Sequence, residues 1–161
     1  MKVIEITTGM RDIAEGLADE IPAHIRNSIM GGKHRIVGMV AEVALAHHLQ
    51  GRCASTYEYD VIAPCNTTFE VKAKKSKVCR PGDEASVCVH NTRQKADYYA
   101  FLRVKPDLSK VAVAGYYPQA QYIKDARFLC KGEKDGDNGF IVREDCYNMF
   151  HRDLWDDYKK K

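Results

Sequence analysis

The fold is decided by residues 59–72, which read YDVIAPCNTTFEVK. Two runs rich in β-branched and aromatic residues, Tyr57–Ile62 and Thr68–Ala73, flank the turn-forming tripeptide Pro64-Cys65-Asn66. Such runs favour extended strands, and a short break that contains proline and asparagine favours a reversal of the chain between them. The pattern therefore predicts a β-hairpin.

The predicted hairpin gathers charged side chains on one of its faces. If the hairpin is centred on Cys65, Asp60 lies directly opposite Glu70. Side chains alternate along a strand, so Glu70 shares a face with Lys72 and Lys74, while the apolar residues between them share the other face. Two carboxylates and a lysine are thus expected to converge, in a register that depends on the turn.

Opposed carboxylates need a positive group between them, because like charges directly across a sheet destabilise it. A hard divalent cation meets this need, since Mg²⁺ takes oxygen ligands from one or two carboxylates and keeps several waters. Lys72 would lie beside such an ion, where it could orient or help deprotonate a water molecule, or stabilise charge on a phosphate. The alternative is a surface hairpin on which Glu70 and Lys72 simply face solvent.

A second segment, residues 33–50, has the apolar periodicity of a helix, with Gly51 as its expected C-terminal cap. Glu42 is the only acidic residue in this segment, and its neighbours one turn away are small or apolar. Burial of an unpaired carboxylate is costly. Glu42 either reaches water or Arg35 at the helix edge, or it points at the hairpin as a third carboxylate. We favour the second interpretation.

The remaining segments predict a mixed α/β protein with a central sheet. Residues 8–29 read as a helix that is capped by Thr8, bent by Pro22 and marked by an apolar stripe starting at Ile13. After the hairpin, the sequence predicts strands at 86–90, 98–104, 111–116 and 140–142, a turn or short helix at 91–96, a helix at 119–130 and a helical C-terminal tail.

The composition is that of a globular protein. The chain has 161 residues, of which 45% are hydrophobic and 29% charged, and this excludes a disordered or fibrous class. No run approaches the ~18 apolar residues of a membrane span, and no export signal is visible, so we expect a cytoplasmic protein of a bacterial or phage-infected cell with no membrane partner.

The six cysteines are expected to be reduced thiols. The alternative is a zinc site built from Cys79, Cys88 and His90, or from Cys146 and His151.

Basic residues cluster along the chain, although the formal net charge is only +3. The run from Lys72 to Arg80 contains no acidic residue, which is the usual footprint of phosphate binding but is also compatible with a solvated face. The candidate nucleic-acid contacts are Lys74, Lys75, Lys77, Arg80, Arg93 and Lys95.

Three motifs follow one another in an order that resembles the PD-(D/E)XK nuclease superfamily. They are Gly38-x-x-Ala41-Glu42-x-Ala44-Leu45 on the predicted helix, then Tyr59-Asp60, then Phe69-Glu70-Val71-Lys72. The later stretch 95–102 is similar to the segment that leads into the family's next core strand. The resemblance covers residues 33–116. It implies a restriction-endonuclease-like αβββαβ core with a mixed central sheet flanked by helices, to which residues 8–30 and 119–161 are additions within a single domain, 1–161.

The resemblance also implies roles for individual residues. Asp60, Glu70 and the backbone carbonyl of Val71 would bind Mg²⁺ or Mn²⁺, and Lys72 would serve the attacking water. Glu42 matches a helix acid that many members use near the metal. One departure is Tyr59, which stands where the family often has proline before the aspartate.

We therefore expect a metal-dependent endodeoxyribonuclease that hydrolyses double-stranded or branched DNA, site-specific in the manner of the homing endonucleases of phages and introns. Gln94 is similar to a residue that assists phosphate or water positioning in some members, and it joins the candidate DNA contacts. The alternatives are a Holliday-junction resolvase or repair nuclease, a DNA-binding module that keeps the fold without chemistry, and a zinc-dependent interaction module. Because one site cuts one strand, cleavage of both strands implies a homodimer or higher homo-oligomer.

Overall fold

The computed structural model describes residues 1–20, 35–54, 56–135 and 139–159, so the predicted bend at Pro22 lies outside the described residues. The helices are α1 (Thr8–Glu20), α2 (Arg35–Leu49) and α3 (Gln119–Asp125), with short 3₁₀ turns η1 (Val89–Arg93) and η2 (His151–Asp153). The strands are β1 (Lys2–Glu5), β2 (Arg52–Cys53), β3 (Val61–Ile62), β4 (Thr68–Lys75), β5 (Glu84–Cys88), β6 (Tyr98–Val104), β7 (Lys110–Pro118), β8 (Arg127–Leu129) and β9 (Cys146–Phe150). Within this part of the chain, no helix combines the length and the apolar character needed to cross a membrane.

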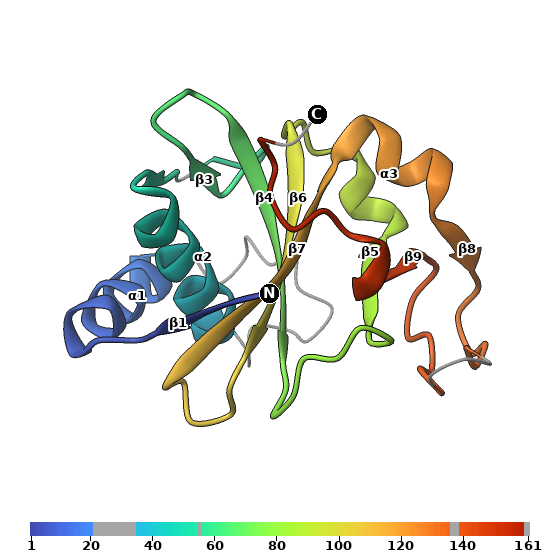
Figure 1. Ribbon diagram of the computed structural model, residues 1–161, viewed down its shortest axis with the longest axis horizontal. Coiled ribbons are helices and arrows are strands. Elements are labelled where there is room, and N and C mark those ends of the chain that lie inside the picture. The colour runs from blue at the N-terminus through green and yellow to red at the C-terminus, as the bar shows by residue number, and fades with distance from the viewer. Residues whose placement is uncertain (21–34, 55, 136–138, 160–161) are drawn as a thin grey trace.

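The elements form three layers (Figure 1). A curled six-stranded sheet with the order β1-β7-β6-β4-β3-β2 lies in the centre. Strands β4 and β6 run parallel, and the other neighbouring pairs run antiparallel. Helices α1 and α2 cover one face of this sheet, and α3 with the small antiparallel sheet β5-β9-β8 lies on the other side. The prediction of a mixed α/β protein with a central mixed sheet is confirmed.

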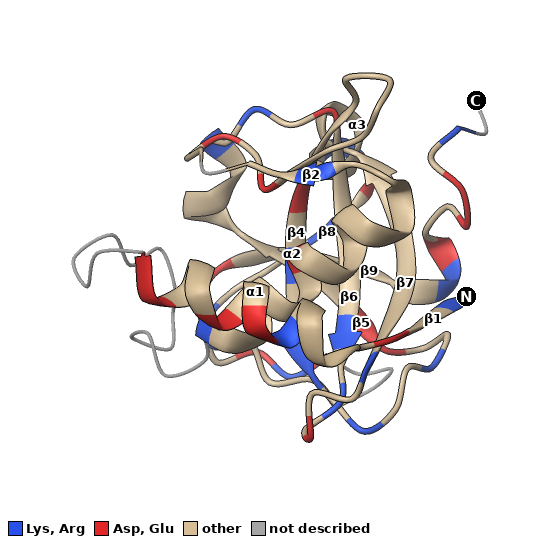
Figure 2. Ribbon diagram, turned by 90° about the vertical axis from the view of Figure 1, so that its left-hand side faces the viewer, with Lys and Arg blue, Asp and Glu red and all other residues tan. Residues whose placement is uncertain are grey.

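Two apolar cores hold the central strands from both sides. From α2, Val40, Ala41 and Leu45 are fully buried against the sheet. Tyr99 of β6 and Tyr122 of α3 are fully buried in the second core, beneath the small sheet. Figure 2 shows acidic residues along α1, whereas the ribbon of α2 is uncharged over most of its length because α2 is enclosed between α1 and the sheet. The strands that carry the predicted patch are therefore rigidly supported.

The predicted register of the hairpin is confirmed, because β3 pairs with β4 so that Val61 lies opposite Phe69. The first strand is shorter than the predicted 57–62. The Thr56 hydroxyl donates to the Tyr59 carbonyl at 2.8 Å and accepts from the Tyr59 N–H at 3.2 Å, which turns the chain before the strand begins. This local bonding competes with strand pairing.

The ends of the first two helices differ from the prediction. The cap of α1 is Thr7 rather than Thr8, since the Thr7 hydroxyl accepts a hydrogen bond from a backbone N–H of the first turn at 3.2 Å. At the end of α2, Gln50 takes the left-handed conformation with φ 55°, which the prediction assigned to Gly51. Gly51 is needed for a different reason, because a Cβ there would lie 2.2 Å from the Ile62 carbonyl oxygen.

Helix α1 is rotated relative to the predicted apolar stripe. Ile13 is 57% exposed, whereas Met10 and Ala14 are buried in the core that α1 shares with α2. The prediction for Ile13 is therefore wrong, because contact with α2 decides which face of α1 is buried. The stripe beyond residue 20 lies outside the described residues.

The crossover from β4 to β6 differs from the predicted αβββαβ order. Within the described residues this crossover holds β5 and η1, and no α-helix. The predicted strand at 86–90 exists as β5, but it pairs with β9 in the small sheet. Strand pairing with a distant segment has replaced the local helix of the expected pattern.

The C-terminal third departs most from the prediction. The helix predicted at 119–130 ends at Asp125, and the next residues form β8 against β9. The strand predicted at 140–142 is reduced to one bridge between Lys134 and Ile141. The tail predicted to be helical instead forms β9 and η2. These segments are fixed by pairing with each other, and such pairing overrides local propensity.

Candidate active site

Three elements bring Glu42, Asp60 and Glu70 to one end of a groove of about 1360 Å³. Glu42 projects from the middle of α2, Asp60 immediately precedes β3, and Glu70 is the third residue of β4. Because β3 pairs with β4 only at the start of β4, the flank of β4 from Glu70 onward carries no strand. Side chains from the helix and the hairpin meet at this uncovered flank.

Hydrogen bonds fix the side chains of this patch. The Asp60 Oδ2 accepts from the Val71 N–H at 2.7 Å, across the hairpin. The Lys72 Nζ donates to Glu70 Oε1 at 2.7 Å and to Gln94 Oε1 at 3.3 Å. Glu70 is 4% exposed and the Lys72 side chain 14% exposed, so this pair does not face solvent as it would on a surface hairpin.

The acids are short of positive charge. Burial, followed by the charge of Glu70, raises the pKa of Asp60 from its ordinary 3.8 to about 7. Burial also raises the pKa of Glu42 well above its usual range, with further contributions from Asp60 and Glu70. Lys72 acts in the opposite direction on both groups, but its single charge does not compensate three carboxyl groups. A further cation would relieve this repulsion.

The two carboxylate oxygens of Glu70 differ in their contacts. Its Oε1 is bound by Lys72, whereas its Oε2 is buried and has no hydrogen-bond partner. Among the described residues, no group of three or more His, Cys, Asp or Glu side chains is placed to hold a metal ion. The donors nevertheless fit Mg²⁺ or Mn²⁺, since such ions are commonly held by one or two carboxylates with water completing the shell.

Gln119, the first residue of α3, is a positioning residue that the sequence did not reveal. It is 7% exposed, and its Oε1 accepts from the Ala96 N–H at 2.6 Å. Its Nε2 donates to the Gln94 carbonyl and, at 3.1 Å, to the Tyr99 hydroxyl. Gln119 thereby holds the segment that places Gln94 against Lys72. A polar residue at the start of a predicted helix gives no signal of this, because its partners lie far away in the sequence.

The predicted nucleic-acid contacts lie in different surroundings. Exposed positions are held by Lys75, Lys77, Arg80, Arg93 and Lys95. Arg93 lines a separate hollow of about 490 Å³. Lys74 lines the groove of the three acids, but it is half-buried and bound to Glu84. The basic run therefore begins inside the groove and continues onto the exposed surface.

Neither zinc combination is assembled within the described residues. The Cys79 Sγ lies 3.5 Å from His151 Nδ1, Cys88 lies opposite Cys146 across β5 and β9, and His90 is exposed. All six cysteines are free. Burial raises the pKa of Cys79 and of Cys88, and that of Cys146 to about 11, so these thiols stay protonated at neutral pH.

No protein-family model matches the chain, and no curated protein matches its sequence. The function is therefore inferred from the geometry and chemistry of the groove.

Proposed function

We propose that the protein is a divalent-metal-dependent endonuclease that hydrolyses phosphodiester bonds in DNA. The observation that carries this proposal is the meeting of Glu42, Asp60 and Glu70 beside Lys72, with one buried Glu70 oxygen unpartnered. A structural ion pair would need only one of these carboxylates. Three carboxylates beside a single lysine suit a site that takes a cation and then a phosphate.

The residues of the site have distinct chemical roles. Asp60 and Glu70 would hold Mg²⁺ or Mn²⁺, assisted by Glu42 and the carbonyl of Val71. When bound, such a cation polarises the phosphate and lowers the pKa of a water molecule. Lys72, fixed by its ion pair with Glu70, orients the attacking water and donates to a phosphate oxygen as negative charge develops. The water oxygen gives up a proton to the solvent and bonds to phosphorus while the bond from phosphorus to the leaving sugar oxygen breaks, and the leaving oxygen takes up a proton from the solvent.

The order of the elements supports a place in the PD-(D/E)XK superfamily. Helix α2 is followed by β2, β3 and β4 as in the first half of the αβββαβ core, and β6 then runs parallel to β4. The acids lie at the uncovered flank of β4, which corresponds to the edge expected from the resemblance. The crossover with β5 and η1 is the departure from the family pattern.

Cleavage of a supercoiled plasmid and of a four-way junction, each with Mg²⁺, tests this function. We expect the wild-type protein to cut DNA, and Glu70→Gln and Lys72→Ala each to lose at least about 100-fold in rate, as for removal of one charge-stabilising group. The matched controls Glu15→Gln and Lys124→Ala, at exposed positions of α1 and α3, should cut like the wild type.

The products distinguish the roles within this chemistry. Discrete plasmid bands would support a site-specific homing-type endonuclease acting on both strands as a homodimer. Preference for the junction would support a Holliday-junction resolvase. Equal cleavage by the wild type, Glu70→Gln and Lys72→Ala would overturn the site, and DNA binding without any cleavage would leave the non-catalytic module as the better account.

A further inference from the structure

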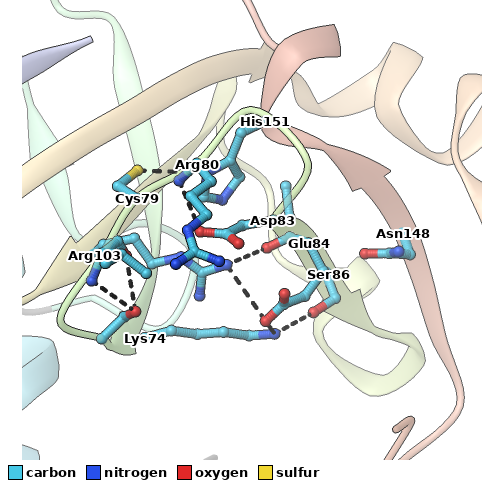
Figure 3. A network of polar contacts seen from close by, with 12 residues as sticks. Lys74, Cys79, Arg80, Asp83, Glu84, Ser86, Arg103, Asn148 and His151 are labelled. Atoms are coloured by element: carbon cyan, nitrogen blue, oxygen red, sulfur yellow. Dashed lines mark hydrogen bonds and ion pairs between the residues drawn. The ribbon is translucent and has the colours of Figure 1, made fainter. Parts of the chain in front are cut away.

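The far end of the groove holds a second charged cluster that the proposed chemistry does not use (Figure 3). Lys74 follows Lys72 on the same face of β4, and its Nζ donates to Glu84 Oε1 at 2.9 Å and to Ser86 Oγ at 2.8 Å. From β6, the Arg103 Nη2 donates to the Glu84 carbonyl at 2.6 Å and lies 3.3 Å from Glu84 Oε1. One carboxylate thus serves two cations.

The ionised groups of this cluster are two cations and two carboxylates. Although burial opposes its ionisation, Lys74 and Arg103 hold the pKa of Glu84 below its usual range, so its single charge is fully present. His151 lines the same end of the groove, where burial and then Arg103 lower its pKa to about 4, so it is neutral at pH 7. The carboxylate of nearby Asp83 accepts a backbone N–H of its own turn at 2.8 Å. This hydrogen bond leaves the charge of Asp83 in place, so the two cations Lys74 and Arg103 face the two carboxylates of Glu84 and Asp83.

Arg103 also has an unused donor. Its side chain is 6% exposed, and its Nε N–H is buried without an acceptor among the described residues. The Lys74 ammonium group donates to Glu84 and Ser86 and lies 4.3 Å from the centre of the Phe140 ring. An ion pair that only joined the two sheets would need one cation and would leave no guanidinium N–H unsatisfied, because buried donors without partners are costly.

We propose that Lys74, Ser86 and Arg103 form a subsite for a second phosphate group of the nucleic acid. This inference rests on the proposed nuclease function. Two residues along a strand span about 7 Å, so a nucleic-acid strand with its scissile phosphate at Lys72 would pass directly to Lys74. The ligand is a set of phosphate oxygens, which either an internal phosphodiester or a terminal phosphomonoester supplies.

Binding of inorganic phosphate to the whole chain, without divalent metal, tests the subsite independently of cleavage. We expect millimolar phosphate to raise the Tm of the wild type above its value in chloride of equal ionic strength, because a ligand of the folded state stabilises it. Lys74→Gln should lose this shift, and the exposed control Lys124→Gln should keep it. An equal shift in the wild type and Lys74→Gln, or no shift in the wild type, overturns the subsite.

The Lys74 side chain is 35% exposed, so Lys74→Gln is expected to fold. If this variant is unfolded, Ser86→Ala takes its place. It removes one hydroxyl contact and keeps both cations, and it should reduce the phosphate-induced shift. A full shift in Ser86→Ala would then count against the subsite.

Fluorescent single-stranded oligonucleotides with a 5′-phosphate, a 3′-phosphate or two hydroxyl ends distinguish the two sources of phosphate. They are bound to Glu70→Gln, which should not cut, and to Glu70→Gln combined with Lys74→Gln. We expect the second substitution to weaken binding about tenfold, through loss of a charge-assisted hydrogen bond.

Weakening for all three oligonucleotides assigns an internal phosphate, and weakening confined to one phosphorylated end assigns a terminal phosphate. Unchanged binding of every oligonucleotide overturns the subsite. Phosphate binding that depends on Lys74, in a protein that cuts neither plasmid nor junction, would refute the nuclease proposal alone.

Discussion

Replacing Asp60 by asparagine should stabilise the metal-free protein at neutral and alkaline pH. The Asp60 Oδ2 accepts the Val71 N–H at 2.7 Å, and the amide oxygen of asparagine can keep this hydrogen bond. The substitution removes the negative charge, which burial and the charge of Glu70 oppose. Asp60→Asn therefore separates the electrostatic cost of the site from its hydrogen bonding.

The sign and the size of the effect follow from the pKa of Asp60. Because burial raises this pKa from 3.8 to about 7, the folded protein binds more protons than the unfolded chain between these values. The wild type therefore loses stability as the pH rises from about 4 to about 7, and the loss persists above that range. This displacement of the pKa corresponds to at most about 4 kcal/mol. The free energy of unfolding of Asp60→Asn should equal that of the wild type at about pH 4. At about pH 8 it should exceed that of the wild type by up to about 4 kcal/mol.

Urea unfolding in EDTA, followed by circular dichroism across this pH range, measures the effect. The exposed control Asp12→Asn, on α1, should behave like the wild type at every pH. Mg²⁺ should stabilise the wild type and leave Asp60→Asn nearly unchanged, which narrows the difference between them. The electrostatic reasoning is refuted if Asp60→Asn is no more stable than the wild type at about pH 8. It is also refuted if the difference in free energy of unfolding between the two proteins is the same at about pH 4 and at about pH 8.

Three further substitutions test the packing around the site. Gly51→Ala should destabilise the fold by at least about 2 kcal/mol, because its Cβ would lie 2.2 Å from the Ile62 carbonyl oxygen; an unchanged Tm would contradict this. Tyr122→Phe should lower the free energy of unfolding in urea by about 1–2 kcal/mol, since the single proton of the buried hydroxyl is shared between backbone carbonyls of β5 and β9. Equal stability would show that this hydrogen bonding contributes little. Gln119→Leu should lower kcat with little change in KM, because it releases the segment that carries Gln94; a loss of activity that merely follows unfolding would argue against this positioning role.

The hairpin and strand β6 could be predicted because their signals are local. The break at 64–66 fixes the centre of the hairpin, and alternation then fixes which residues face the groove, so the placement of Asp60 against Glu70 needed no distant contact. Strand β6 has the bounds predicted for it, 98–104, because six of its seven residues are buried and Arg103 is the only charged residue among them.

Strand β9 and the far end of the groove could not be predicted in the same way. Asn148 is fully buried in β9, where its Nδ2 donates to Asp135 at 3.1 Å, so a polar residue interrupts the pattern that would indicate a strand. Arg103 lies among the apolar residues of β6. Its charge is tolerated there because Glu84, on β5, accepts a hydrogen bond from it and forms an ion pair with it. The partners of both residues are distant in the sequence and come close only in the folded protein.

The groove combines repelling carboxylates at one end with an unpartnered guanidinium donor at the other, and this combination supports the proposed ligands. Phe69 is fully buried on the helix-facing side of β4, and alternation then places Glu70, Lys72 and Lys74 on the opposite face at fixed spacing. The apolar cores hold these groups in place even though the acids repel one another at one end and, among the described residues, the Arg103 Nε N–H has no acceptor at the other. A metal ion alone would relieve only the repulsion among the acids, and a phosphate alone would supply an acceptor only to the Arg103 Nε N–H. A metal ion together with a nucleic-acid strand, whose successive phosphates reach both ends, would relieve both.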